Sequence, residues 1–248
     1  MASTLEMADG GFLSGGDWSF QGSSTAAVVN KGRILARTGD VIMIARQVEN
    51  HGEIRATNGV VALGAGVEVL VSRAEDAARR IYVQPREEEG EAGVWNTGSV
   101  EAMQVEFEAA GGNPYALAIN NEGVIRATGG VQREGRVFLV SKGGTLKHSG
   151  SIYATNRDGS GGYVKLLGKG KTTENPGQVF VTGLIEAEGN SLLAGGRVEI
   201  LGGSDRADMK MRRSRSGAEM AGCCWLGGII RERMRKFTTR KKFMSGRM

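Results

Sequence analysis

The chain has 248 residues and a formal net charge of +5, but this charge is unevenly distributed. Residues 204–248 hold 13 basic and 4 acidic residues, a balance of +9, whereas residues 1–203 hold 19 basic and 23 acidic residues, a balance of −4. The basic character therefore belongs to the tail, which also holds both cysteines, and this excludes a disulfide framework for residues 1–203.

A short phrase, Gly-x-(Ile/Val)-x-Ala, recurs six times within residues 32–187. Its third and fifth residues are apolar, and the fourth is polar or charged in four of the six copies, which is the alternation of a strand with one buried face. Recurrence every 20 to 33 residues, with one doubled gap, indicates one structural unit stacked on itself. The copies begin at Gly32, Gly52, Gly98, Gly123, Gly150 and Gly183.

Two further strands are predicted in each unit. A second phrase, Gly-x-Val-x-(Leu/Ile/Met), follows most copies and begins at Gly39, Gly59, Gly135, Gly162 and Gly196. A weaker third strand is expected between units, as in residues 67–71, 81–83 and 179–181. The units leave no room for a helix.

Because like strands recur one unit later, each unit should lie parallel on the one before it. The prediction is an all-β fold, a right-handed parallel β-helix (β-solenoid) of about seven coils. With coils about 4.8 Å apart, the rod would be roughly 30 to 35 Å long.

The repeat also predicts which side chains fill the interior. The alanines that end each phrase should stack in one inward row, beside a row of isoleucines and valines. The alanine row comprises Ala36, Ala56, Ala102, Ala127, Ala154 and Ala187. Four asparagines lie two residues before a repeat glycine, where stacked amides can hydrogen-bond along the axis, and we assign them to turn chemistry and not to binding. They are Asn30, Asn50, Asn96 and Asn121.

Four stretches of the chain resemble a known family. Residues 28–34, 47–54, 59–66 and 112–121 resemble the repeats of filamentous haemagglutinin-like exoproteins. That family comprises large bacterial secreted or surface β-helix proteins, many of them exported by the two-partner route and several acting as adhesins. The resemblance covers about residues 11–203. For a longer parent protein it implies a secreted or cell-surface location, an outer-membrane transporter as export partner, and an unknown receptor or glycan as adhesive partner.

The start of the chain departs from the family. Residues 1–16 have no basic start and no apolar run long enough for a signal peptide. Residues 11–20 are expected to enter a coil of the solenoid directly. We interpret the chain as an internal fragment.

The tail departs as well. We expect residues 1–203 to form the β-helix repeat domain and residues 204–248 to form a basic, disordered tail without the repeat. Basic clusters at residues 231–237 and 240–243 are of the kind that neutralises phosphates. However, if the tail is translated back into codons and read one nucleotide earlier, permitted codons give glycine-rich turns and alternating strands, including the string GGDYQG. The amino-acid sequence does not determine the first base of each shifted codon, so this reading is permitted and not forced. We favour a frameshift product, with the shift near residues 203–207, and predict no specific nucleic-acid partner. Stop codons in the offset frame of the encoding DNA would contradict this hypothesis.

Two glycine-rich segments are weak candidates for ligand binding. Residues 168–172 resemble the end of a phosphate-binding loop, but the first glycine of that motif would fall at Lys165 and no helix pattern follows, so a solenoid turn is expected. Residues 156–162 resemble a calcium-binding nonapeptide, yet they occur once and lack the Gly-Gly-x-Gly-x-Asp order, so a loop is expected. No cofactor site is predicted.

Histidines, cysteines and one acidic run complete the candidates. His51 and His148 lack a neighbouring cysteine or carboxylate cluster and are expected to be exposed turn residues. Cys223 and Cys224 are adjacent, which suits neither a metal nor an easy disulfide, so no metal site is predicted. Residues 79–93, which include an acidic run at 87–91, are predicted to be a variable surface loop and the best location for binding specificity.

Two function classes fit these observations. A structural or adhesive rod requires a continuous core, polar outer positions and no polar cluster, and on the sequence the chain meets all three demands. A polysaccharide-binding or polysaccharide-cleaving β-helix protein is the alternative, because fold alone does not separate the two. We also expect the isolated rod to associate end to end through the unpaired edges of its terminal coils.

The enzymatic alternative requires two carboxylates, or a carboxylate with Arg or Lys, on one face. The glutamates of the repeat alternate with core residues, as an outward face would, and the aspartates fall at unrelated points of the repeat. We therefore predict no catalytic residues and no enzymatic activity. The glutamates in question are Glu53, Glu101, Glu186 and Glu199, and the aspartates are Asp9, Asp17, Asp40, Asp76 and Asp158.

Overall fold

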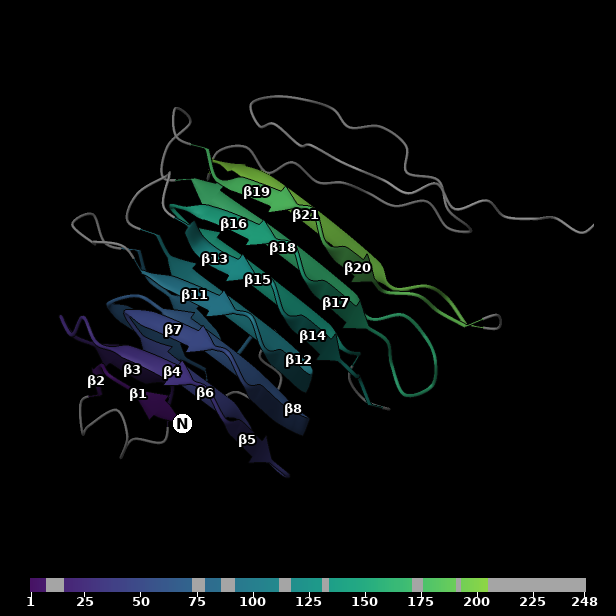
Figure 1. Ribbon diagram of the computed structural model, residues 1–248, viewed down its shortest axis with the longest axis horizontal. Coiled ribbons are helices and arrows are strands. Elements are labelled where there is room, and N and C mark those ends of the chain that lie inside the picture. Colours follow the sequence, from purple (N-terminus) through teal and green to yellow (C-terminus); the bar gives the residue numbers. More distant parts are fainter. Residues whose placement is uncertain are drawn as a thin grey trace, which may run out of the picture.

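The computed structural model describes residues 1–7, 16–72, 79–85, 92–111, 117–130, 134–170, 176–190 and 193–204. Within these ranges the chain is all-β, with 21 strands and no helix. The strands form sheets of eleven, six and four strands (Figure 1). The tail from residue 205 onward, with Cys223 and Cys224, lies outside the described residues, as do residues 86–91 and 112–116.

The six-stranded sheet contains one strand from each unit, in chain order. Its strands all pair in parallel and lie one above another from the N-terminal to the C-terminal end of the stack (Figure 1). They are β4 (Ala27–Asn30), β7 (Gln47–Asn50), β11 (Gly93–Asn96), β13 (Leu117–Asn121), β16 (Thr145–His148) and β19 (Gln178–Val181).

The eleven-stranded sheet consists of two strips. The long strands β8 (Glu53–Ala65) and β12 (Ser99–Ala110) run through both strips and so connect them. Strip one holds the strands of the Gly-x-(Ile/Val)-x-Ala phrase: β5 (Arg33–Ala36), the first part of β8 and of β12, β14 (Val124–Ala127), β17 (Ser151–Ala154) and β20 (Leu184–Glu186). Strip two holds the strands of the second phrase: β1 (Ala2–Ser3), β6 (Val41–Ala45), the remainder of β8 and of β12, β15 (Arg136–Lys142), β18 (Tyr163–Gly170) and β21 (Arg197–Ser204). All of these pairings are parallel, as the recurrence of like strands predicted.

The register confirms the predicted inward rows. The alanine of each phrase pairs with the alanine of the next from Ala36 to Ala154, and Ala187 packs against the same core just beyond β20. The isoleucines and valines two positions earlier form the neighbouring row, and both rows belong to one cluster of buried residues between the sheets. The strand alternation read from the sequence therefore identifies the core face correctly.

The repeat glycines mark the places where successive layers touch. A Cβ atom placed on any of the five later glycines would lie well under 3.0 Å from the carbonyl oxygen of the glycine one layer before. Real Cβ atoms do not approach backbone so closely, so only glycine fits this column. These five residues are Gly52, Gly98, Gly123, Gly150 and Gly183.

A four-stranded antiparallel sheet, called here the side sheet, lies against strip two. It consists of β2 (Glu6–Met7), β3 (Trp18–Gln21), β9 (Glu68–Val71) and β10 (Ile81–Val83). A second cluster of buried residues joins it to strip two, with Phe20, Val69 and Ile81 packed against Ile44 and Ala62.

The side sheet corrects three predictions. Residues 67–71 and 81–83 are not third strands of coils, and residues 18–20 do not enter a coil, because β3, β9 and β10 pair antiparallel outside the stack. The third strand of each unit is instead the one in the six-stranded sheet, as expected only for residues 179–181. The doubled gap between the second and third copies of the repeat is the excursion that builds β9 and β10.

Candidate functional site

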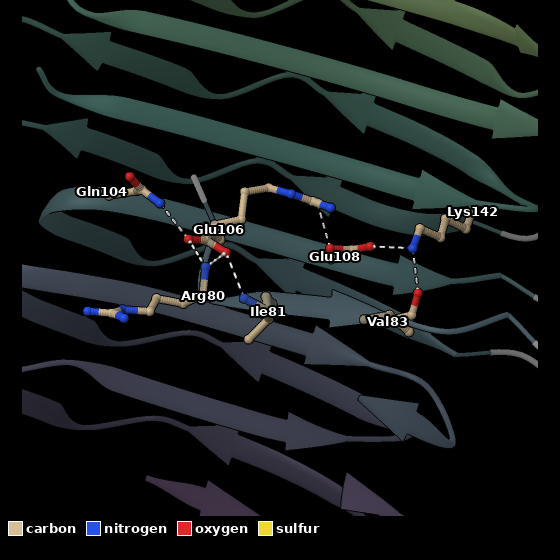
Figure 2. A network of polar contacts seen from close by, with 8 residues as sticks. Arg80, Ile81, Val83, Gln104, Glu106, Glu108 and Lys142 are labelled. Atoms are coloured by element: carbon tan, nitrogen blue, oxygen red, sulfur yellow. Dashed lines mark hydrogen bonds and ion pairs between the residues drawn. The ribbon is translucent and has the colours of Figure 1, made fainter. Parts of the chain in front are cut away.

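Glu106, in β12, is a buried carboxylate beneath the side sheet and was not among the residues expected from the sequence to form a site. Its oxygens accept hydrogen bonds from the backbone N–H of Arg80 at 2.7 and 2.8 Å and from that of Ile81 at 3.0 Å. Gln104 Nε2 donates a further hydrogen bond at 2.6 Å (Figure 2). Glu106 therefore holds the backbone of the side sheet at the point where β10 begins.

The environment of Glu106 changes its titration. Burial raises the pKa of Glu106 to about 6, although the hydrogen bonds from Arg80, Ile81 and Gln104 favour the ionised form. A carboxyl group with a higher pKa in the folded chain binds more protons when folded than when unfolded. Its contribution to stability is therefore fully present in acid, below the unfolded pKa, and is lost as the pH rises through about 6.

Glu108 lies two residues further along the same face of β12 and is 1% exposed. Its carboxylate forms ion pairs with Arg79 at 2.7 Å and with Lys142 at 2.8 Å. Lys142, at the end of β15, also donates a hydrogen bond to the carbonyl oxygen of Val83 at 2.6 Å (Figure 2). This group of contacts connects the side sheet to two successive layers of strip two.

The two glutamates supply the residue types that the enzymatic alternative requires, since two carboxylates lie on one face beside an arginine and a lysine. Residues i and i+2 of a strand are about 7 Å apart along the chain. Glycosidases, however, bring their carboxylates into contact with a substrate, and Glu106 and Glu108 are both 1% exposed beneath a sheet that they bind. The arrangement suits an anchor for the side sheet.

A second polar cluster lies on the last layers of strip two. Tyr163 Oη donates a hydrogen bond to Glu199 at 2.8 Å, and Arg197 and Lys165 are ion-paired with the same carboxylate. Burial and the acceptance of this hydrogen bond by Glu199 raise the pKa of Tyr163 to about 12. Burial alone would raise the pKa of Glu199, but the Tyr163 hydroxyl and the two cations lower it below its usual value. Glu199 is thus on the outward face, as predicted, but is engaged by its neighbours.

The outer face of strip one is partly exposed and carries charges of both signs. Arg55 is 3.0 Å from Glu101 in the next layer, and further along the same row the guanidinium of Arg126 lies 4.4 Å from the centre of the Tyr153 ring. Ion pairs of this exposed kind add little stability. A row of guanidinium, carboxylate and aromatic groups on an open face is able to contact an external partner through charge and ring stacking.

The asparagines form the predicted ladder. Each amide donates through Nδ2 to Oδ1 of the next, at 2.8, 2.8 and 2.7 Å, from Asn30 through Asn50 and Asn96 to Asn121. All four side chains are buried. Hydrogen bonding along the axis is thereby confirmed.

His148 continues this ladder, so the expectation that it is an exposed turn residue is wrong. It lies two residues before Gly150, which is the ladder position, and it is fully buried. Asn121 Nδ2 is 2.9 Å from His148 Nδ1, and His148 Nε2 is 3.1 Å from the carbonyl oxygen of Leu184. The second contact corresponds to the one from Asn50 Nδ2 to the carbonyl oxygen of Ser99. Because the amide donates to Nδ1, the fitting form of His148 is the neutral tautomer with its proton on Nε2.

His148→Asn is expected to make the chain less sensitive to acid. Burial lowers the pKa of His148, against the opposing effect of the Leu184 and Asn121 carbonyl groups. A histidine with a lowered pKa stabilises the fold above its unfolded pKa, and this contribution is lost as the pH falls below that value. An asparagine keeps the ladder without this titration. Urea unfolding near pH 7 and near pH 5 should show that the free energy of unfolding falls less on acidification in His148→Asn than in the unaltered chain. The titration of Glu106 affects both chains equally and cancels in this comparison. Equal losses would contradict this role of His148.

The remaining predicted features lie as follows. His51 is exposed, as expected, and its ring contacts Thr97 at 2.8 Å and Glu49 at 2.7 Å. Residues 156–162 form the expected loop, closed by a bridge between Thr155 and Gly161. Residues 168–170 belong to β18 and are not a turn, whereas residues 171 and 172 lie outside the described residues.

The predicted surface loop at residues 79–93 is corrected in part. Ile81 and Val83 are fully buried in the side sheet, and Arg79 is bound to Glu108. The acidic run at 87–91 lies outside the described residues. Across the described ranges no three His, Cys, Asp or Glu side chains gather in a way that could hold a metal ion.

Comparisons with known proteins add no assignment: no protein family model matches the chain, and no curated protein matches it significantly. In the part of the chain that the structure describes, no helix is long and apolar enough to cross a membrane.

Proposed function

We propose that the chain is a structural module of a secreted or surface-attached bacterial adhesin of the filamentous haemagglutinin-like kind, without catalytic activity. The observation that carries this proposal is the stacking of six layers in register, each with the same inward rows. Such a stack can be lengthened by adding layers, which suits a scaffold that extends from a surface. Export with an outer-membrane transporter partner belongs to the same proposal and follows from the resemblance in sequence.

The layers support a right-handed parallel β-helix in which each layer is one coil. In successive layers the chain passes through the six-stranded sheet, strip one and strip two in the same order. Crossovers between parallel strands are right-handed in nearly all sheets. On this proposal the described residues hold six coils, with β1 as part of a seventh.

The adhesive surface in this proposal is the open row on strip one. It contains the cation–π pair of Arg126, which is exposed, and Tyr153, whose ring is partly exposed. Such groups stack on sugar rings and attract anionic substituents. The partner class is therefore a glycan or glycosylated receptor on a cell surface.

Adhesion is tested with beads that carry the full chain. Such beads are expected to bind cultured epithelial cells, and a glycan array should retain the soluble chain. The double variant Arg126→Ala/Tyr153→Ala should bind less, whereas Lys147→Gln, which changes a charge in β16 of the six-stranded sheet and not in this row, should bind normally. Beads that adhere no better than albumin-coated beads would overturn the adhesive proposal.

The alternative is a polysaccharide-binding or polysaccharide-cleaving β-helix protein, which the pair Glu106 and Glu108 brings into consideration. Incubation of the full chain with a panel of polysaccharides separates the adhesive proposal from the cleaving form of this alternative. We expect no new reducing ends and no unsaturated products. Turnover that disappears in Glu106→Gln would establish the alternative instead.

A further inference from the structure

The first layer of the stack has an open edge. Among the described residues, β4 pairs only with β7, and β5 pairs only with β8, so the outward edges of β4 and β5 have no partner strand. Val29 is 44% exposed and Leu35 is 53% exposed on these strands. Val28 and Ile34 are only partly buried, although the residues that follow them in the same inward rows are fully buried.

Gly32 indicates what this edge is shaped to receive. Each later glycine of the column lies against the carbonyl oxygen of the glycine one layer before it. Gly32 has the same place in its layer, yet nothing lies within 4 Å of the position that its Cβ would occupy. Its φ is not in the left-handed region, so its own backbone does not call for glycine. A preceding layer would call for glycine, because it would place a glycine carbonyl oxygen against this position, as happens in the later layers.

Asn30 repeats this asymmetry in the ladder. Every later asparagine accepts through Oδ1 from the amide of the layer before. Asn30 Oδ1 accepts only the short-range hydrogen bond from Gly32 N at 3.1 Å within the described contacts. An amide oxygen has two lone pairs, so it is able to accept a further ladder bond from a preceding asparagine.

The third strand of the first layer, β6, already has a partner strand on its outward edge. β1 pairs in parallel with β6, one layer outside it, with Ala2 opposite Met43 and Ser3 opposite Ile44. A second copy docked end to end would bring its β21 to the position that β1 occupies, because Ile200 falls in the row of Met43. A strand–turn–strand segment that pairs only with β4 and β5 meets no such obstacle.

We propose that the β4–β5 edge is a strand-acceptor site for an extended segment of another polypeptide with the pattern Asn-x-Gly-x-(Ile/Val)-x-Ala. The segment pairs in parallel with both strands, extends the asparagine ladder to Asn30 and places its glycine carbonyl over Gly32. Its apolar residues cover Val28 and Ile34. This inference depends on the register of the sheets and is independent of the adhesive role.

The test uses a labelled synthetic peptide with the sequence of residues 47–56, which contains the full pattern. Fluorescence anisotropy with the full chain is expected to show saturable binding, and a scrambled peptide should not bind. Gly32→Ala should weaken binding by at least about tenfold, because the added methyl group would meet the peptide backbone. Absence of saturable binding would overturn the proposal.

The direction of the glycine column separates this edge from the opposite end of the stack. A peptide with alanine in place of its glycine should still bind β4 and β5, because that methyl group would point away from the chain. At the opposite end the same methyl group would meet the carbonyl oxygen of Gly183. Binding that is lost with the alanine peptide and unaffected by Gly32→Ala would place the site at the wrong end and refute the proposal.

Hydrogen exchange gives a second readout that does not rely on the Gly32 variant. The amides of residues 27–30 and 33–36 should gain protection when the peptide is added, and those of residues 178–181 should not. The thermal midpoint of Gly32→Ala alone, compared with that of the unaltered chain, shows whether the variant is folded. Protection confined to residues 178–181 would also refute the proposal.

Discussion

Gly98→Ala is expected to lower the free energy of unfolding by about 3 kcal/mol. The new Cβ would lie against the carbonyl oxygen of Gly52 and at 2.8 Å from its backbone nitrogen. These atoms cannot withdraw easily, because Ser99 N donates a hydrogen bond to the Gly52 carbonyl oxygen at 2.9 Å. Two layers would have to separate, so the loss should appear as a lower midpoint in urea unfolding.

Gly32→Ala is the matched control for this prediction. It is the same substitution at the same place in the repeat, but no atom lies within 4 Å of the new Cβ. Replacing a glycine by alanine without strain reduces the conformational freedom of the unfolded chain and stabilises by about 0.4 to 1 kcal/mol. If the two variants lose equal stability, close stacking of the layers is not the reason for the repeat glycine.

Glu108→Ala is expected to destabilise the chain by about 3 kcal/mol, in the lower part of the range for breaking a buried ion pair. The substitution removes the shared partner of Arg79 and Lys142, whose side chains are each 20% exposed. Those cations would stay partly buried without a counter-charge. The side sheet should loosen first, and faster hydrogen exchange of residues 81–83 would report that change.

Glu101→Ala, in the same strand, serves as the control. Its side chain is 35% exposed, and it pairs with Arg55 at 3.0 Å on the open face of strip one. An exposed pair of this kind contributes about 0 to 1 kcal/mol. Similar losses for the two glutamate variants, or unchanged exchange in β10 of Glu108→Ala, would show that the ion pairs do not anchor the side sheet.

The parallel strands and their core rows were predictable because the signal is local. Alternation of apolar and polar residues decides which side of a strand faces the core, and recurrence decides which strands lie on one another. The second phrase was nevertheless missed in the third unit, where Val105 and Phe107 occupy its inward positions. Met103 lies in the register shift there, where the other units have a glycine.

His148 was misjudged although a signal for it existed. Its spacing from Gly150 equals that of each ladder asparagine from its glycine. Histidine as a residue type favoured an exposed turn, whereas its position two residues before the repeat glycine favoured the ladder. Position prevailed because an imidazole has one acceptor and one donor nitrogen, and the ladder site requires that pair of functions.

The amino-acid sequence alone was sufficient for the parallel strands, the alanine and isoleucine rows and the asparagine ladder, because each depends on spacing within one repeated unit. Only the tertiary structure distinguished Glu101 from Glu108. Both alternate outward from the same strand, yet one faces an open surface and the other is buried under β10. Alternation determines the side of the strand on which a residue lies, but what covers that side comes from β9, β10 and the N-terminal strands, which fold back from outside the unit. Contacts between separate segments of this kind leave no period in the sequence of β12.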